Sequence, residues 1–306
     1  MKIGYPCINR SLSCKGNRTF RLKSYSEERL SQTIKNNLDC LNEILDFNVD
    51  HGILFFRITS DLIPFASHPI CTFPWQRQFR ERFRDIGQFI KDNDIRISMH
   101  PDQFIVLNTP REEVFRRSIA ELAYHATVLD LLDLDKTAKI QLHIGGVYHE
   151  KSQSIKRFIR RYSALDSSIK RRLVIENDEK NYSLNDCLQI YKQTKIPILF
   201  DYFHHSLLNN QESLRQILEA CQKTWKNNDG IPMVDYSSQK PHMIKGAHAE
   251  HLVISDFQSF LYDSVPYDYD IMLEIKDKEK SAVKAIEILK SDNRFINSRK
   301  KKESYG

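Results

Sequence analysis

The chain has 306 residues, a formal net charge of +6 and 41% apolar residues, so it is long enough to bury a full hydrophobic core. No uninterrupted apolar run is longer than Ile53–Phe56, which is far short of the roughly 20 apolar residues that cross a bilayer. The first residues, Met1–Cys7, lack the charged start and long apolar stretch of a secretory signal. We therefore expect a cytoplasmic protein without a membrane segment. The basic excess is compatible with a polyanionic partner.

Short β-type runs alternate with polar stretches of helical period from one end of the chain to the other. The predicted strands are Lys2–Tyr5, Ile53–Ile58, Ile95–Met99, Lys139–Leu142, Leu173–Ile175, Ile198–Phe200, Met233–Val234 and Ile271–Leu273. The predicted helices are Glu27–Leu45, Gln76–Lys91, Arg111–Leu132, Ser152–Leu165, Ser183–Lys192, Glu212–Lys226 and Ser281–Lys290. This alternation predicts parallel strands joined by crossover helices, and eight such units close into a (β/α)8 TIM barrel.

The alternative fold of this class is a doubly wound sheet, which would need a Gly-rich turn after a strand. The chain has 9 glycines and no G-x-G-x-x-G motif, which favours the barrel. No linker or break in composition marks a second domain. We therefore expect residues 1–306 to form a single barrel domain that ends in a basic tail from about residue 296.

Six cysteines, at positions 7, 14, 40, 71, 187 and 221, are spread along the chain without a Cys-x-x-Cys pair. This spacing is typical neither of a disulfide scaffold nor of a thiolate zinc site. We expect the cysteines to be reduced and mostly buried as small apolar residues.

Histidines and carboxylates follow the predicted strands at their carboxyl ends, where a barrel of this type assembles its active site. From the third strand to the eighth these residues are His100, His143, Glu176, Asp201 with His204, Asp235 and Glu274. Several carboxylates converging in one barrel mouth repel each other unless cations neutralise them. Few lysines or arginines stand at the strand ends, so the sequence predicts bound metal ions.

The predicted ligands combine imidazole with carboxylate and include no thiolate, which favours Mn²⁺ or Zn²⁺ over Mg²⁺ or Ca²⁺. One ion takes about four to six ligands, so eight or nine candidates predict two or three ions. Glu176 lies between the two histidines and the Asp201 group, and is the predicted bridging carboxylate. His68 and His248 follow the second and seventh strands. Each is a further candidate for the site, with a plain loop histidine as the alternative.

Two other features suit a nucleic acid partner. Gln103 and Phe104 directly follow His100 and Pro101 on a loop above the predicted metals, where they either pack the loop or wedge against a base. Arg160 and Arg161 belong to a basic run that either contacts phosphates or forms a solvated face.

The residues resemble the UV damage endonucleases, relatives of endonuclease IV among the metal-dependent (β/α)8 repair enzymes. The resemblance extends from Gly4 to Lys276 and rests on an ordered set of segments. They are Arg57–Pro64 with Ser67–Pro69, His100–Phe104, His143–Gly146, Ile175–Asp178, Asp201–His204 and Met272–Lys276. The resemblance implies up to three divalent ions, manganese first, with zinc, cobalt or magnesium as alternatives. The positions that match the family's ligands are His100, His143, Glu176, Asp201, His204, Asp235, His248 and Glu274.

The resemblance also implies roles for individual residues. His68 matches a further active-site histidine, and we expect it to act in catalysis with Glu176 and Glu274. The positions that match residues facing the damaged nucleotides and the bases opposite them are Tyr5, Asn9, Gln103 and Phe104.

The chain departs from the family pattern after the seventh strand. The family commonly has Lys-x-His before a Ser-Ser pair, with the lysine modified near the metals, where this chain has Met233-Val234-Asp235-Tyr236 before Ser237 and Ser238. Met233 cannot be carboxylated, and Asp235 adds one negative charge in place of a histidine. Phe104 stands where a tyrosine is expected, which preserves stacking and removes a phenolic hydrogen bond.

The function implied by the resemblance is metal-dependent nicking of double-stranded DNA on the 5′ side of UV photoproducts, carried out by a monomer. Damaged dinucleotides stack poorly, so extruding them costs less than extruding normal bases. The alternatives are an endonuclease IV-like enzyme for abasic sites, a xylose isomerase-like sugar isomerase and a non-catalytic DNA-binding barrel. The basic charge and the Gln103–Phe104 pair favour DNA over a sugar.

Overall fold

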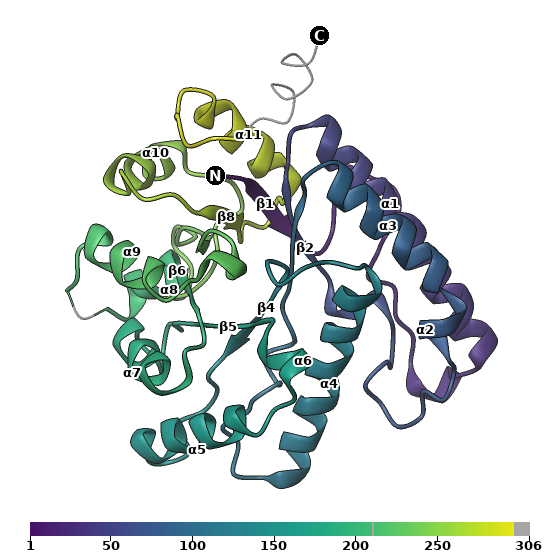
Figure 1. The fold of residues 1–306 in the computed structure, drawn as a ribbon. Helices are drawn as coiled ribbons and strands as arrows, with labels where there is room; N and C mark the ends of the chain where they lie inside the picture. Colours follow the sequence, from purple (N-terminus) through teal and green to yellow (C-terminus); the bar gives the residue numbers. More distant parts are fainter. Residues whose placement is uncertain (210, 297–306) are drawn as a thin grey trace.

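The computed structural model describes residues 1–209 and 211–296, and its strands form a closed parallel barrel in chain order (Figure 1). The strands are β1 (Ile3–Pro6), β2 (Phe55–Ile58), β3 (Arg96–Met99), β4 (Lys139–His143), β5 (Leu173–Glu176), β6 (Ile198–Asp201), β7 (Met233–Tyr236) and β8 (Asp270–Leu273). The first and last strands complete the ring, with Ile3 opposite Ile271. The predicted barrel is confirmed, and the doubly wound sheet is excluded because its sheet would stay open.

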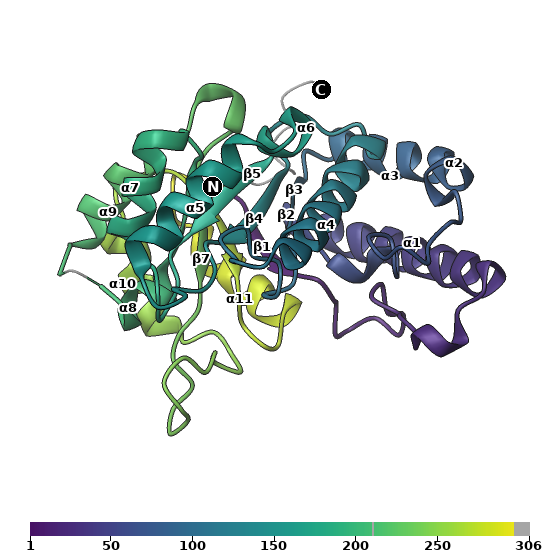
Figure 2. The same cartoon turned by 90° about the horizontal axis from the view of Figure 1, so that it is seen from below.

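Helices surround this barrel on all sides (Figures 1 and 2). The longer ones are α1 (Glu27–Asp50), α3 (Arg80–Asp92), α4 (Glu112–Leu131), α5 (Lys151–Ser163), α7 (Leu184–Thr194), α9 (Leu214–Gln222), α10 (Ile254–Asp263) and α11 (Glu279–Leu289). The short ones are α2 (Trp75–Gln78), α6 (Ser167–Lys170) and α8 (Tyr202–Leu207). In α1 the residues Leu30, Ile34 and Leu38 repeat at helical spacing and are fully buried, which fixes the face that packs on the barrel.

The structure differs from the predicted helices in several places: one predicted helix is divided, and α6, α8 and α10 were not predicted. The helix predicted over Gln76–Lys91 is divided into α2 and α3, because the backbone leaves helical geometry at Phe79, with φ at −108°. Helix α10 between β7 and β8 was not predicted. It buries Phe257, Phe260 and Leu261, which recur at the three- and four-residue spacing of an amphipathic helix.

The barrel interior is built in layers, because residues two positions apart on a strand point to the same side. One layer is an apolar cluster of Phe55, Val174, Leu199, Met233 and Met272. Two positions further along the same five strands stand polar residues, namely Arg57, Glu176, Asp201, Asp235 and Glu274. The apolar layer therefore forms the floor beneath a polar cavity at the carboxyl ends of the strands. Met233 belongs to this floor.

Cys14 and Cys40 form a disulfide, with their Cα atoms 5.6 Å apart, so the prediction of reduced cysteines is wrong for this pair. The segment after β1 folds back over α1, where the Asn37 amide donates to the Arg18 carbonyl at 3.0 Å and accepts from the Arg18 N–H at 2.9 Å. This contact brings Cys14 beside the helix. The remaining cysteines, Cys7, Cys71, Cys187 and Cys221, are free.

Among the described residues, no helix has both the length and the apolar character needed to cross a membrane. The basic tail expected from about residue 296 falls on residues 297–306, which lie outside the described part of the chain.

Candidate metal centre

The predicted site residues meet in the polar cavity above the apolar floor. His143, Glu176 and Asp201 are the last residues of β4, β5 and β6, and His100 and Glu274 directly follow β3 and β8. Asp235 stands inside β7, one residue before its end. Among the described residues, two groups of side chains have ligand atoms within 4.8 Å of one another. These groups are His100 with His143 and Glu176, and Asp201 with Asp235 and Glu274.

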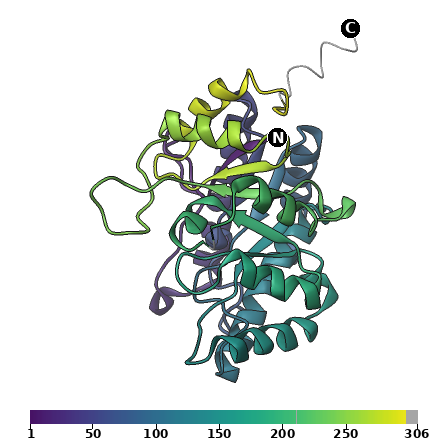
Figure 3. The same cartoon turned by 90° about the vertical axis from the view of Figure 1, so that its left-hand side faces the viewer.

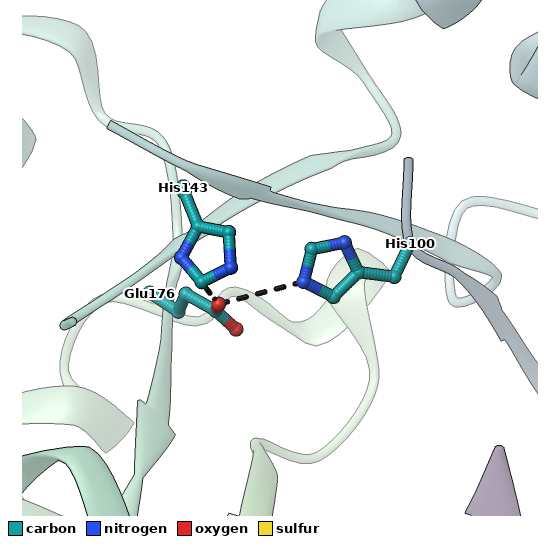
Figure 4. Close-up of side chains that lie close together, drawn as sticks. All are labelled: His100, His143 and Glu176. Carbon is teal, nitrogen blue, oxygen red and sulfur yellow. Dashed lines mark ion pairs between the residues drawn. The ribbon is translucent and has the colours of Figure 1, made fainter. Parts of the chain in front are cut away.

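The first group is centred on the carboxylate of Glu176, to which both imidazole rings point (Figure 4). The Oε1 atom of Glu176 lies 2.7 Å from Nδ1 of His143 and 3.5 Å from Nε2 of His100. Glu176 is buried, and its second oxygen accepts a hydrogen bond from Gln141. One carboxylate oxygen therefore faces two imidazole nitrogens from neighbouring strands.

The second group contains a cation that the sequence interpretation missed. The guanidinium of Arg57 donates to the two carboxylate oxygens of Asp235 at 2.8 and 2.7 Å and also to Glu274. Arg57 and Asp235 are both buried. The expectation that basic residues are scarce at the strand ends is therefore wrong at this position, because Arg57 lies at the end of β2 with its charge directed inward.

Gln141 connects the two groups. Its amide nitrogen donates to Glu176 and to Asp235, the latter at 2.6 Å, while its oxygen accepts from Arg57 at 2.7 Å. Like Arg57, it is a polar residue inside an apolar strand run. In each case the residue two positions earlier on the strand, Phe55 or Lys139, also points into the barrel. This spacing of two residues along the strand is the sequence signal that identifies Arg57 and Gln141 as interior residues.

The pKa values show an unbalanced concentration of charge. Burial raises the pKa of Asp201 to about 7. Burial also disfavours the charged form of Glu274, but the Arg57 guanidinium outweighs it and lowers the pKa to about 2. Burial lowers the pKa of His143, but the Glu176 carboxylate raises it by more, and the resulting pKa is about 9. Without further cations, the site therefore holds protons at neutral pH on groups that are candidate metal ligands.

His204 and His248 lie beside these two groups. Asp201 caps helix α8 by accepting from the His204 N–H at 2.7 Å, and Nδ1 of His204 is 3.2 Å from the same carboxylate. The rings of His143 and His204 are 6.2 Å apart, and those of His204 and His248 are 6.3 Å apart. Nδ1 of His248 contacts the Glu274 carbonyl at 2.8 Å. Both histidines therefore extend the row of imidazoles along the cavity.

Three of the predicted site residues lie apart from this centre. His68 is exposed, accepts from the Ile70 N–H at 3.1 Å and belongs to neither group of ligand atoms. Tyr5 and Asn9 are buried, and Tyr5 donates to the Asn48 side chain at 2.7 Å while accepting from Asn9 at 3.0 Å. The ring of Tyr5 packs edge-on against Phe56, outside the barrel interior. The expected contact of Tyr5 and Asn9 with nucleotides therefore finds no support in their positions.

Gln103 and Phe104 lie at the rim. A cavity of about 550 Å³ at the mouth is lined by Arg57, His100, Gln103, His143, His248, Glu274, Lys276 and Lys278, among others. The ring of Phe104 is 72% exposed, which is unusual for so large an apolar side chain. Arg161, in contrast, is buried and donates to the carbonyls of Leu107 and Thr109, so it braces this loop and does not face phosphates. Arg160 is exposed.

The closed (β/α)8 barrel carries at its mouth two groups of histidines and carboxylates that could hold metal ions, which defines a barrel protein with a candidate metal centre. The family model described as UV-endonuclease UvdE matches residues 1–303, and the chain belongs to this family. A UV DNA damage endonuclease from Clostridium perfringens is 43% identical over 305 residues, covering 99% of this chain and 74% of the relative.

Solved structures agree with the family assignment. The crystal structure of SacUVDE is 48% identical, with a TM-score of 0.92, and the match covers 96% of this chain and 100% of that one. Endonuclease IV from Thermus thermophilus is 14% identical with a TM-score of 0.54, covering 82% of this chain and 92% of that one. The second likeness shows a shared fold.

Proposed function

We propose that the protein is a DNA repair endonuclease that hydrolyses the phosphodiester on the 5′ side of a UV photoproduct, using divalent ions held at the barrel mouth. Membership of the UvdE family supports the DNA substrate and the UV lesion. The observation that carries the metal-dependent chemistry is the pair of ligand groups, each with donor atoms within 4.8 Å of one another. Because the barrel closes within one chain, we propose a single catalytic domain. We also propose that it acts as a monomer in the cytoplasm.

The residues present fit divalent ions. Asp201 and Glu176 are buried carboxylates, and one guanidinium cannot neutralise them together with Asp235 and Glu274. Imidazole and carboxylate donors together suit manganese, and zinc, cobalt or magnesium are the alternatives. Two ligand groups support two ions, and the neighbouring His204 and His248 complete the proposed ligand set. Bound divalent ions would supply an activated water and stabilise charge on the departing oxygen.

The chain's own side chains position the substrate and the ligands. Arg57 holds Asp235 and Glu274 with a charge that does not titrate in the accessible pH range. Lys276 and Lys278 line the same cavity and are placed to contact the phosphates beside the scissile bond. We propose that Glu176 and Glu274 act in catalysis as metal ligands. His68 is exposed and lies outside both ligand groups, so a catalytic role for it requires direct contact with the bound DNA.

The proposal is tested by incision of three duplexes that carry a cyclobutane dimer, an abasic site or no damage. We expect cutting of the dimer duplex on the 5′ side, with 3′-hydroxyl and 5′-phosphate ends, and loss of cutting when a chelator removes divalent ions. Incision of the abasic duplex alone would select the endonuclease IV-like alternative. Cutting that survives exhaustive chelation would overturn the metal-dependent part.

Metal affinity should increase with pH from about 6 to about 9, because ions compete with protons for the same groups. His143 has a pKa of about 9 in the metal-free site and Asp201 one of about 7, so both release protons when an ion binds at lower pH. Titration calorimetry with Mn²⁺ in two buffers of different ionisation enthalpy counts the released protons. His51→Ala, at an exposed histidine after α1, is the control. An affinity independent of pH would contradict this assignment of ligands.

Replacing both Gln103 and Phe104 with alanine should lower the preference for a photodimer over undamaged DNA by about tenfold or more. A side chain that fills the space left by an extruded base compensates for unstacking, which costs a few kcal/mol per step. Because Phe104 is exposed and neither residue belongs to the ligand groups, metal content and melting temperature should not change. Competition binding between damaged and undamaged duplexes measures the effect. A parallel fall in melting temperature and activity, with preference retained, would make the pair structural.

A further inference from the structure

A second exposed apolar feature lies across the mouth from Phe104. The segment 237–249 follows β7, and we call it the β7 loop. It extends away from the body of the barrel as the long green loop at the bottom of Figure 2 and at the left of Figure 3. Near its tip, Met243 is 53% exposed and Ile244 is 79% exposed. Two adjacent large apolar side chains in water are unfavourable unless a partner covers them.

The shape of this loop is held from within, independently of the side chains at the tip. Gln239 pairs with His248 in an isolated β-bridge at the base of the loop. The Gln239 amide donates to the carbonyls of Lys240 and Ile244, both at 3.0 Å, and accepts from the Gly246 N–H at 2.9 Å. A loop braced in this way presents Met243 and Ile244 at a defined position.

The base of the loop is part of the catalytic mouth. His248 lines the central cavity and contacts the Glu274 carbonyl at 2.8 Å. Phe104 follows β3 and the β7 loop follows β7. These two strands are four apart in a closed ring of eight, so their loops stand on opposite sides of the mouth. Any duplex long enough to cover the ligand groups therefore meets an exposed apolar side chain on each side.

The charge around the tip selects the kind of partner. Between residues 237 and 249 the loop has Lys240 and Lys245 and no acidic residue, and Lys240 pairs with Glu250, just after the loop, at 2.6 Å. Lys245 reaches the Leu207 carbonyl at 3.1 Å, which keeps its charge close to the body of the barrel. A basic loop with an apolar tip is the arrangement by which proteins hold phosphates and insert a side chain between bases.

We propose that Met243 and Ile244 insert between bases of the DNA bound across the mouth, opposite Phe104, and thereby help to open the duplex at the lesion. This inference rests on the proposed function and adds a second recognition element to it. Lys245, which keeps two further N–H donors beside its bond to the Leu207 carbonyl, contacts a phosphate beside the inserted tip. The loop thus contributes to the choice of damaged over undamaged DNA, because a weakly stacked step is easier to open.

The test compares wild-type protein with a Met243→Ala/Ile244→Ala double variant on a short duplex that carries a cyclobutane dimer and 2-aminopurine beside it. We expect affinity for this duplex to fall on the order of 10- to 100-fold, with loss of the fluorescence increase that reports unstacking. Binding to undamaged duplex should stay within about twofold, because phosphate contacts dominate it. A Met243→Leu/Ile244→Leu variant, which keeps the apolar tip, should restore both signals.

Tyr262→Ala is the matched control. Tyr262 is 78% exposed and stands near the end of α10. This helix leads into the start of β8, at the end of the barrel opposite the mouth. This variant should behave as wild type. If the wild type prefers the damaged duplex and the double variant shows the same affinity and fluorescence increase as the wild type, the inference is overturned. The proposed function then still stands. If the wild type shows no preference, both fail. A wild-type dimer that the double variant converts to a monomer would assign the tip to contacts between copies and overturn the inference.

Discussion

Glu176→Gln should reduce incision of a photodimer duplex to below about one thousandth of the wild-type rate, a loss of about 4 kcal/mol in transition-state stabilisation. The Oε1 atom of Glu176 is the common neighbour of His100 and His143, so the substitution removes the negative charge at the centre of the ligand group. Affinity for DNA should change little, because the lysines proposed to contact phosphates, Lys276 and Lys278, do not belong to the ligand group around Glu176. Single-turnover incision and fluorescence anisotropy measure the two quantities separately.

Glu219→Gln is the matched control for this substitution. Glu219 is a half-exposed carboxylate on α9 that pairs with Lys223 at 2.6 Å, and its loss should leave both the rate and the metal content unchanged. Near wild-type cutting by the Glu176 variant would exclude this residue from the metal centre. Loss of DNA binding in step with activity would instead show a wider structural role.

The positions of the main candidate ligands could be predicted because strand ends can be recognised in a sequence. An apolar run such as Leu173–Ile175 followed by Glu176 defines both a buried strand and the polar residue that leaves its carboxyl end. In a closed parallel barrel all such ends meet at one mouth, so His100, His143 and Glu176 come together although they are far apart in sequence. No knowledge of side-chain contacts is needed for that step.

The remaining features depend on which way a residue faces, and the sequence interpretation did not resolve this. A shift of one residue moves a strand side chain to the other face. Tyr5 is on the outward face of β1, against Phe56, and Arg57 is on the inward face of β2. The disulfide between Cys14 and Cys40 depends on a loop that folds back over α1, and no spacing rule describes such a loop.

The departures from the family pattern are understood together with Arg57. Met233 stands in the apolar floor, so its side chain is chemically inert there. Two positions further along β7, Asp235 brings a negative charge, and the guanidinium of Arg57 meets it through both carboxylate oxygens. The additional carboxylate is therefore balanced by a protein cation. Asp235 and Glu274 therefore share one protein cation, and the other candidate ligands are Asp201, Glu176 and the histidines.

Arg57→Met should lower the free energy of unfolding of the metal-free protein by about 3–5 kcal/mol, because it leaves the buried carboxylates of Asp235 and Glu274 without their cation. The pKa of Glu274, about 2 beside Arg57, should then rise toward and above its ordinary value. The stability that this lowered pKa provides is present above the unfolded value and is lost on acidification toward 2. In the variant this acid-dependent loss should disappear, and acidification through the raised pKa of Glu274 should instead recover stability. Urea unfolding at several pH values measures both effects.

A double variant, Arg57→Met with Asp235→Leu, separates the ion pair from a metal role of Asp235. Removing both partners of a buried pair is often nearly neutral, so most of the lost stability should return. Arg117→Met, which breaks an exposed pair with Glu113 on α4, should cost under about 1 kcal/mol and calibrates the measurement. If Asp235 serves Arg57, the double variant keeps its metal content. A double variant that recovers stability but binds fewer ions would show instead that Asp235 is itself a ligand, with Arg57 holding it in place.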